Sequence, residues 1–131
     1  MLYEFTFPAN ENTPRLARRA LDGQLSSLGP DAESRLRLLI SEVVTNAIRH
    51  GHLAPDEQVD VKVDLKDGGA RVEVSQPTRA EAPVPRQVRD EGGFGLKLVD
   101  ELTDAWGMEA GPPGVVWFEI AAGGEPSEAT R

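Results

Sequence analysis

The chain has 131 residues, 39% of them hydrophobic and 27% charged, which favours one compact globular domain over two domains or a disordered segment. Its 14 basic and 22 acidic residues give a net charge of −8 without a cationic cluster, so direct binding to DNA or RNA is disfavoured. It contains no cysteine, no apolar run of membrane-spanning length and no secretory signal pattern, so we exclude disulfides and thiolate zinc sites and expect a cytoplasmic protein without a membrane partner.

The first predicted elements are a short strand and an amphipathic helix. Apolar and aromatic residues at 2–7 favour a strand, which Pro8 ends. Thr13 followed by Pro14 is typical of a helix start, and the pair Gly29-Pro30 ends the pattern. The apolar positions of this helix recur at three- and four-residue spacing: Leu16, Ala17, Ala20, Leu21, Leu25 and Leu28. A core role and a homodimer face both stay open for the first helix and for three residues before it, Leu2, Tyr3 and Phe5.

A longer helix and a β-hairpin follow. Asp31 is the expected cap of the second helix, and Gly51 is its expected end. The apolar stripe of this helix comprises Leu36, Leu39, Ile40, Val43, Ala47 and Ile48. Alternating apolar residues from Val59 to Leu65 predict a half-buried strand, and Asp67-Gly68-Gly69 predicts a turn into a second strand over 70–75.

The remainder predicts a loop, a helix and two strands. Residues 77–91 contain three prolines, several charges and little periodicity, and we expect a long mobile loop, which is either a functional lid or a disordered insert. A third helix should follow the glycines at 92–95, and Gly111-Pro112-Pro113-Gly114 should join the two final strands. In the last strand, one face should carry Val116, Phe118 and Ile120, and the other Val115, Trp117 and Glu119.

This order of elements predicts an α+β fold. We expect a two-layer sandwich in which a mixed, mostly antiparallel sheet carries about three helices on one face. Residues 1–121 should form the single domain, and the small, polar residues 122–131 should form a disordered tail.

Glu42 and Asn46 are the first candidates for a chemical role. They lie four residues apart in the second predicted helix and so share a face, which Arg49 and His50 continue. A carboxylate can accept a proton, and an amide oxygen can complete the shell of a Mg²⁺ ion that keeps phosphate and water ligands. A solvated helix face explains the pair equally simply.

A glycine-rich segment at 92–96 is the second candidate. Gly92, Gly93, Phe94, Gly95 and Leu96 open the third predicted helix, where free backbone N–H groups and the helix dipole attract phosphate. An ordinary helix entry is the alternative interpretation of this segment alone.

Together these segments resemble a known family. The sequence ISEVVTNAIRHG at 40–51 resembles the N box, and GGFGLKLVD at 92–100 the second glycine box, of the Bergerat-fold (GHKL) ATPases. RVEVS at 71–75, WG at 106–107 and VVWFEI at 115–120 extend the resemblance, which covers about Leu36 to Ile120 in order and spacing. Within that family the sequence is most similar to the anti-sigma-factor serine kinases of Gram-positive and actinobacterial type.

The resemblance implies roles for individual residues. Glu42 matches the general base that takes the proton of a substrate serine hydroxyl, and Asn46 matches the Mg²⁺-binding position. The glycine segment matches the phosphate-binding loop, residues 77–91 match the ATP lid, and Arg49 and Gln76 join the implied nucleotide-binding set. Relatives of this type bind ATP, hold a sigma factor inactive, phosphorylate a STAS-domain anti-anti-sigma protein and often form homodimers.

Two positions depart from the family pattern. Gln76 and Pro77 stand where the resemblance calls for an aspartate that accepts from the adenine amino group, and Val115 stands where a supporting hydroxyl is often found. The amide oxygen of Gln76 can still accept from the amino group, which keeps binding with lower affinity. The opposing interpretation is a pseudokinase whose nucleotide site is vestigial.

Two function classes therefore stay open. The first is an ATP- and Mg²⁺-dependent protein serine kinase and anti-sigma factor. The second is a binding module of the same fold that acts only by sequestering a protein partner. A sensor histidine kinase and a longer gyrase- or chaperone-type ATPase fit less well, because neither a phosphoacceptor-histidine segment nor a transducer domain accompanies the domain.

Overall fold

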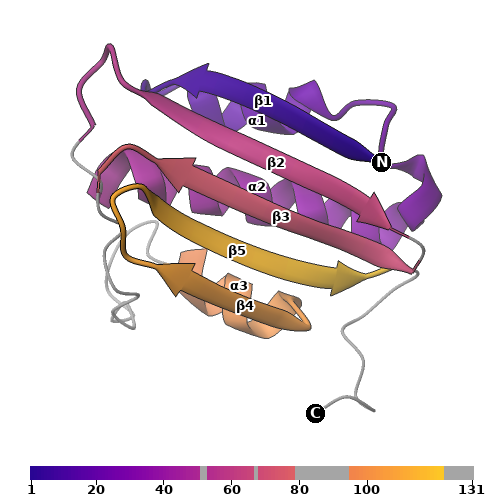
Figure 1. Ribbon diagram of the computed structural model, residues 1–131. Coiled ribbons are helices and arrows are strands. Elements are labelled where there is room, and N and C mark those ends of the chain that lie inside the picture. The colour runs from indigo at the N-terminus through magenta and orange to yellow at the C-terminus, as the bar shows by residue number, and fades with distance from the viewer. Residues whose placement is uncertain (51–52, 67, 79–94, 123–131) are drawn as a thin grey trace.

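The computed structural model describes residues 1–50, 53–66, 68–78 and 95–122. The described residues form five strands and three α-helices, with a short 3₁₀-helix between α1 and α2, arranged as in Figure 1. In chain order these are β1 (Leu2–Pro8), α1 (Thr13–Ala20), η1 (Ser26–Leu28), α2 (Pro30–His50), β2 (Gln58–Lys66), β3 (Gly69–Gln76), α3 (Gly95–Leu102), β4 (Ala105–Glu109) and β5 (Gly114–Ala121).

The five strands form one sheet in the order β1-β2-β3-β5-β4. Each neighbouring pair is antiparallel, so the described residues contain no parallel pair, although the expected sheet was mixed. β1, β2 and β3 follow one another both along the chain and across the sheet. The last two strands exchange places, so that β5 lies between β3 and the edge strand β4. The predicted hairpin is confirmed: β2 and β3 meet at Gly68, whose φ of 87° suits a residue without a Cβ.

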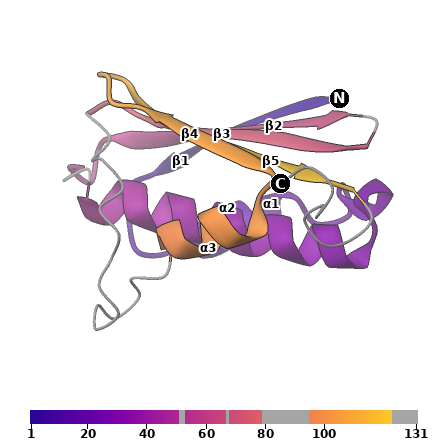
Figure 2. The same cartoon turned by 90° about the horizontal axis from the view of Figure 1, so that it is seen from below.

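All three α-helices cover the same face of the sheet, as Figure 2 shows, and the other face is left open. This confirms the predicted two-layer α+β architecture. The core lies between the layers, where the alternating side chains of β2, β3 and β5 meet the apolar stripe of α2. Its largest fully buried side chains include Phe118, Leu36, Leu39, Ile40, Val43, Val61 and Val72.

The first helix is shorter than the apolar pattern predicts. α1 ends at Ala20, and a turn with Gly23 at a φ of 82° leads into the 3₁₀-helix. Leu21, Leu25 and Leu28 are nevertheless buried, because the turn and η1 keep them facing the sheet. Leu16, expected in the apolar stripe, is 39% exposed, since the buried side of α1 passes through Thr13 and Ala17 instead.

The second helix is close to its predicted extent. It begins at Pro30, so Asp31 lies in the first turn instead of capping it, and it reaches His50. The predicted stripe is buried except for Ile48, which is partly buried against the core. The predicted terminator Gly51 lies outside the described residues.

Several predicted segments lie partly or wholly outside the described residues. They include residues 79–91 of the predicted lid, Gly92, Gly93 and Phe94 of the glycine segment, and the tail from residue 123. The final strand pair is confirmed, with Phe118 and Ile120 buried towards the helices. None of the helices in the described ranges is long and apolar enough to cross a lipid bilayer.

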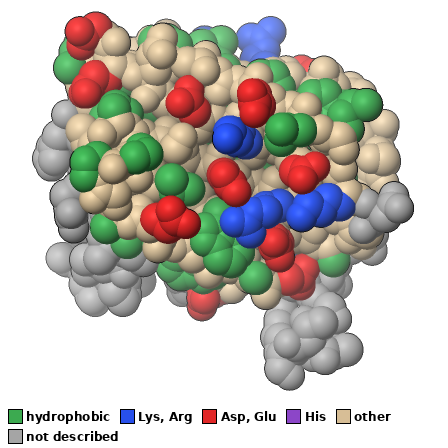
Figure 3. Space-filling model, viewed as in Figure 1, with side chains coloured by type: hydrophobic (Ala, Val, Ile, Leu, Met, Phe, Trp, Pro, Cys, Tyr) green, Lys and Arg blue, Asp and Glu red, His purple; other side chains and the backbone are tan. Residues whose placement is uncertain are grey.

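The open face of the sheet is mainly polar and bears a cation–π contact between Arg71 and Trp117. The guanidinium carbon of Arg71 lies 4.3 Å from the centre of the Trp117 ring. The same guanidinium forms ion pairs with two carboxylates, from Nε to Oε2 of Glu73 at 3.2 Å and from Nη1 to Oε2 of Glu119 at 3.0 Å. On β4, a Cβ at Gly107 would stand 2.7 Å from the same ring, so the indole lies directly over the glycine. Figure 3 shows acidic side chains scattered over this face, with a few basic ones among them.

The edge strand β1 carries Leu2, Tyr3 and Phe5, for which the sequence left a core role and a homodimer face open. Tyr3 and Phe5 are partly buried against the core, which supports their core role. Leu2 is 54% exposed on the open face. Trp106, by contrast, faces the helices and donates from Nε1 to Oδ1 of Asp100 on α3, at 3.1 Å.

Candidate functional site

The predicted site residues gather at one end of the helical layer. In Figure 1 the carboxyl-terminal half of α2, the end of β3 and the start of β5 lie at the same edge of the molecule. α2 packs against α1 on one side and α3 on the other, and it also contacts β3. The fold therefore brings the second-helix candidates, Gln76 and the start of α3 to a common region.

Glu42 and Asn46 lie on α2 and are both half-buried. Neither side chain hydrogen bonds to any other residue in the part of the chain that the structure describes. Among the described residues only Arg35 has a side-chain polar atom that is both buried and unpartnered, so the polar atoms of Glu42 and Asn46 are accessible to solvent. Arg49 is exposed one turn further along α2, and the side chain of His50 is not described.

The environment of Glu42 alters its acidity. Burial raises the pKa of the Glu42 carboxyl, because the ionised form loses hydration, while the positive charges of Arg49 and Arg18 partly oppose the rise. A carboxylate with a raised pKa is a stronger base than one in water. The environment therefore suits Glu42 to accept a proton.

Gln76 ends β3 and is buried, with 6% of its surface exposed. Its Nε2 donates to Oγ1 of Thr78, at 2.9 Å. The Thr78 carbonyl in turn accepts from the backbone N–H of Gly114, at 2.8 Å, which ties this segment to the start of β5. The amide is thus held in place at the site end of the sheet.

Val115 does not occupy the position predicted for it. It pairs with Ser75 across the β3–β5 ladder and points to the open face with Trp117, whereas Gln76 points towards the helices. The residue opposite Gln76 is Gly114. The hydroxyl beside Gln76 therefore comes from Thr78, two residues along the same chain segment, and not from the last strand.

The start of α3 supplies the last part of the site. α3 begins at Gly95, and Leu96 lies in its first turn, where backbone N–H groups lack partners within the helix. Gly92, Gly93 and Phe94 lie outside the described residues, so their phosphate-binding role stays a prediction. Taken with Glu42 and Asn46, these donors and acceptors fit a phosphate group with a divalent cation.

Two residues near the site, Thr78 and Arg18, and one at the far end of α3, Arg35, escaped the sequence interpretation. Thr78 could have been suspected, because it is the first hydroxyl after the position where an aspartate was expected. Arg18 affects Glu42 only through the packing of α1 on α2, and Arg35 meets α3 across 67 residues of chain. No local pattern predicts such tertiary contacts.

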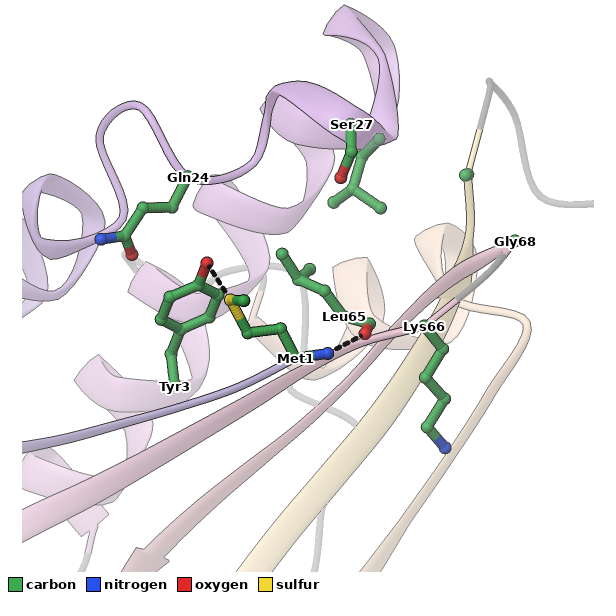
Figure 4. A pocket seen from close by; sticks show the side chains of 9 residues that line it. Met1, Tyr3, Gln24, Ser27, Leu65, Lys66 and Gly68 are labelled. Atoms are coloured by element: carbon green, nitrogen blue, oxygen red, sulfur yellow. Dashed lines mark hydrogen bonds between the residues drawn. The ribbon is translucent and has the colours of Figure 1, made fainter.

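A separate cavity of about 360 Å³ lies at the other end of the sheet. Figure 4 shows Tyr3, Gln24 and Ser27 around it, while the Lys66 side chain extends away from them. The Met1 ammonium donates to the Leu65 carbonyl at 2.6 Å, so the N-terminus belongs to the wall of this cavity. None of the predicted site residues lines it.

Comparison with known proteins gives one family. Residues 7–117 match the family model described as a histidine kinase-like ATPase domain. No curated protein matches the sequence. The matched range contains all the candidate residues on α2, on β3 and at the start of α3.

Proposed function

The chain belongs to the histidine kinase-like ATPase family, and from this premise we propose that it is a regulatory protein serine kinase of the anti-sigma-factor type. In this proposal it binds ATP with Mg²⁺, holds a sigma factor inactive, and phosphorylates a serine of a STAS-domain antagonist. The family implies ATP binding; the kinase activity, the cation and the protein partners are the proposed part.

The environment of Glu42 is the observation that carries the proposal. Simple nucleotide binding does not need a half-buried carboxylate with a raised pKa, since negative charge near phosphates opposes binding. A carboxylate with a raised pKa is instead suited to take the proton of an attacking hydroxyl. Glu42 and Asn46 lie four residues apart on one face of α2, which supports the proposal of a base and a cation ligand side by side.

Each residue then has a distinct task. Asn46 would bind the cation through its side-chain oxygen, and the N–H groups at the start of α3 would hold phosphate oxygens. Gln76, fixed by Thr78, would accept a hydrogen bond from the base of the nucleotide. Bound ATP supplies the phosphoryl group, and Glu42 accepts the proton that leaves the substrate hydroxyl.

A second candidate function rests on Gln76. A neutral amide replaces the carboxylate that the resemblance calls for, and the loss of one charge-assisted hydrogen bond costs roughly 1.5–3 kcal/mol, or about tenfold to a hundredfold in affinity. The alternative is therefore a binding module of the same fold with weakened nucleotide binding, which acts by sequestration alone.

Calorimetric titration of the purified protein with Mg-ATP and Mg-ADP separates these functions. We expect micromolar binding by the natural protein, and tighter binding by roughly tenfold or more in Gln76→Asp. Absence of binding at millimolar nucleotide in the natural protein, restored in Gln76→Asp, would favour the sequestering module.

Phosphoryl transfer is then tested with candidate STAS-domain proteins and radiolabelled ATP. Glu42→Gln should keep nucleotide affinity and lose transfer, whereas Asn46→Ala should lose Mg²⁺-dependent affinity. Glu4→Gln, which removes the same charge from the exposed outer face, is the matched control and should transfer normally. Equal transfer by Glu42→Gln and the natural protein would refute the assigned base.

A further inference from the structure

Arg35 joins three elements that are far apart in the sequence. From α2, its Nη1 donates to the Leu102 carbonyl at the end of α3, at 3.2 Å, and its Nη2 donates to the Ala121 carbonyl at the end of β5, at 3.4 Å. Its Nε is buried and has no hydrogen-bond partner among the described residues. None of the ion pairs in the same residues involves this half-buried guanidinium.

Such an arginine is not explained by stability alone. Burying an N–H group without a partner is unfavourable, and a desolvated charge without a counter-charge is more so. An apolar side chain of similar length would fill the same space without either penalty. The guanidinium does complement the partial negative charge at the carboxyl end of α3, so its electrostatic partner is this helix.

α3 is fixed mainly through its carboxyl-terminal half. Val99 is fully buried, the Thr103 hydroxyl donates to the Val99 carbonyl at 2.6 Å, and Trp106 donates to Asp100. Arg35 adds the link between the last turn of α3 and α2. The amino end of α3, which carries the phosphate-facing N–H groups, lies at the opposite end of the helix.

We propose that Arg35 is a positioning residue that sets the direction of α3, so that the amino end of the helix faces the phosphates next to Asn46. This inference rests on the proposed nucleotide site. The 8 residues of α3 span about 12 Å, so a tilt of about 5° at the Leu102 end moves the amino end by about 1 Å. A displacement of about that size lengthens the hydrogen bonds from these N–H groups to charged phosphate oxygens, and the loss of one such bond lowers affinity by roughly tenfold to a hundredfold.

The test compares a ligand that has phosphates with one that lacks them. Mg-ADP affinity is measured by calorimetry and adenosine affinity by ligand-observed NMR, for the natural protein and for Arg35→Met. We expect Mg-ADP to bind about tenfold or more weakly in Arg35→Met, and adenosine affinity to change by less than about twofold. Arg35→Lys, which keeps one donor group near the carbonyls, should recover part of the loss.

Arg37→Met is the matched control. Arg37 lies two residues away on the same helix and is also half-buried, but its partners are the Arg18 carbonyl, Asp22 and Glu33, on the side of α1. It should lose stability without any change in the ratio of the two affinities.

Amide hydrogen exchange over residues 99–103 gives a readout that needs no ligand, because these are the N–H groups that bond within α3. Exchange should be faster in Arg35→Met than in Arg37→Met, because Arg35, unlike Arg37, bonds to α3. An unchanged ratio of Mg-ADP to adenosine affinity, an equal loss of both, or identical exchange in the two variants would each overturn the inference while leaving the proposed function intact. A natural protein that binds neither ligand would instead refute the proposed function, and this inference with it.

Discussion

Glu42→Gln separates the catalytic role of the carboxylate from its cost to the fold. The substitution removes the ionisable group and keeps the shape of the side chain. Removal of a general base typically slows transfer by roughly 10²–10⁴-fold, or about 3–5 kcal/mol of transition-state free energy. We therefore expect transfer to be nearly lost in this variant.

The same substitution should stabilise the folded protein near neutral pH. Burial raises the pKa of Glu42 in the folded state above that of the unfolded chain, so ionisation favours unfolding. The gain in the free energy of unfolding from Glu42→Gln is absent below the pKa of a glutamate in the unfolded chain, about 4.3. It grows as the pH rises and is complete above the pKa of Glu42 in the folded protein. Because the carboxylate is half-exposed, screening by solvent keeps this gain in the free energy of unfolding small.

Urea denaturation at pH 4 and at pH 8, followed by circular dichroism, measures this difference. Glu4→Gln changes the net charge equally and corrects for the general repulsion in a chain of charge −8. A Glu42→Gln variant that is less stable than Glu4→Gln at pH 8 would refute the burial argument, and with it the reason for assigning Glu42 as the base.

Four further substitutions test the electrostatics and the packing. Arg18→Met removes a charge that lowers the pKa of Glu42, so the acid limb of the pH–rate profile for transfer should move to higher pH; an unmoved limb would contradict the coupling. Gly69→Ala places a Cβ against the Ile120 carbonyl oxygen, and the loss of about two ladder hydrogen bonds with added strain should lower the free energy of unfolding by about 2–4 kcal/mol in urea denaturation. Gly23→Ala meets open space and is opposed only by the positive φ, so it should cost about 1 kcal/mol. A larger loss in Gly23→Ala than in Gly69→Ala would contradict the steric argument. Phe118→Ala removes the largest fully buried side chain of the described residues and should lower the free energy of unfolding by roughly 3–5 kcal/mol in the same assay. A loss of less than about 2 kcal/mol would show that the core collapses around the gap.

The sequence predicted the elements well where one periodicity runs without interruption. Alternation in β2, β3 and β5 and the stripe of α2 all lead to buried side chains, because one face of each element must meet the other layer. α1 shows the limit of this reasoning. Leu21, Leu25 and Leu28 keep helical spacing and are buried, yet a turn at Gly23 separates them from α1, so spacing alone did not reveal the break.

The candidate site was predictable only where a residue acts through its own element. Glu42 and Asn46 share a helix face by spacing, and the structure places both on that face, half-buried. The alternation of the last strand gave Val115 the correct face, with Trp117, whereas its match to the family position beside Gln76 was wrong, because Gly114 is the residue opposite Gln76. The contacts of Arg18 and Arg35 depend on helix packing, which no local sequence pattern encodes.

The two tryptophans lie on opposite faces of the same sheet, which makes them separate optical probes. Trp106 is bonded to Asp100 of α3, while Trp117 lies between Arg71 and Gly107 on the uncovered face. Trp117→Phe would therefore leave an intrinsic fluorophore that responds to movement of α3 when nucleotide binds. Trp106→Phe would leave one that responds to contacts on the outer surface, so events on the two faces could be followed independently in the same protein.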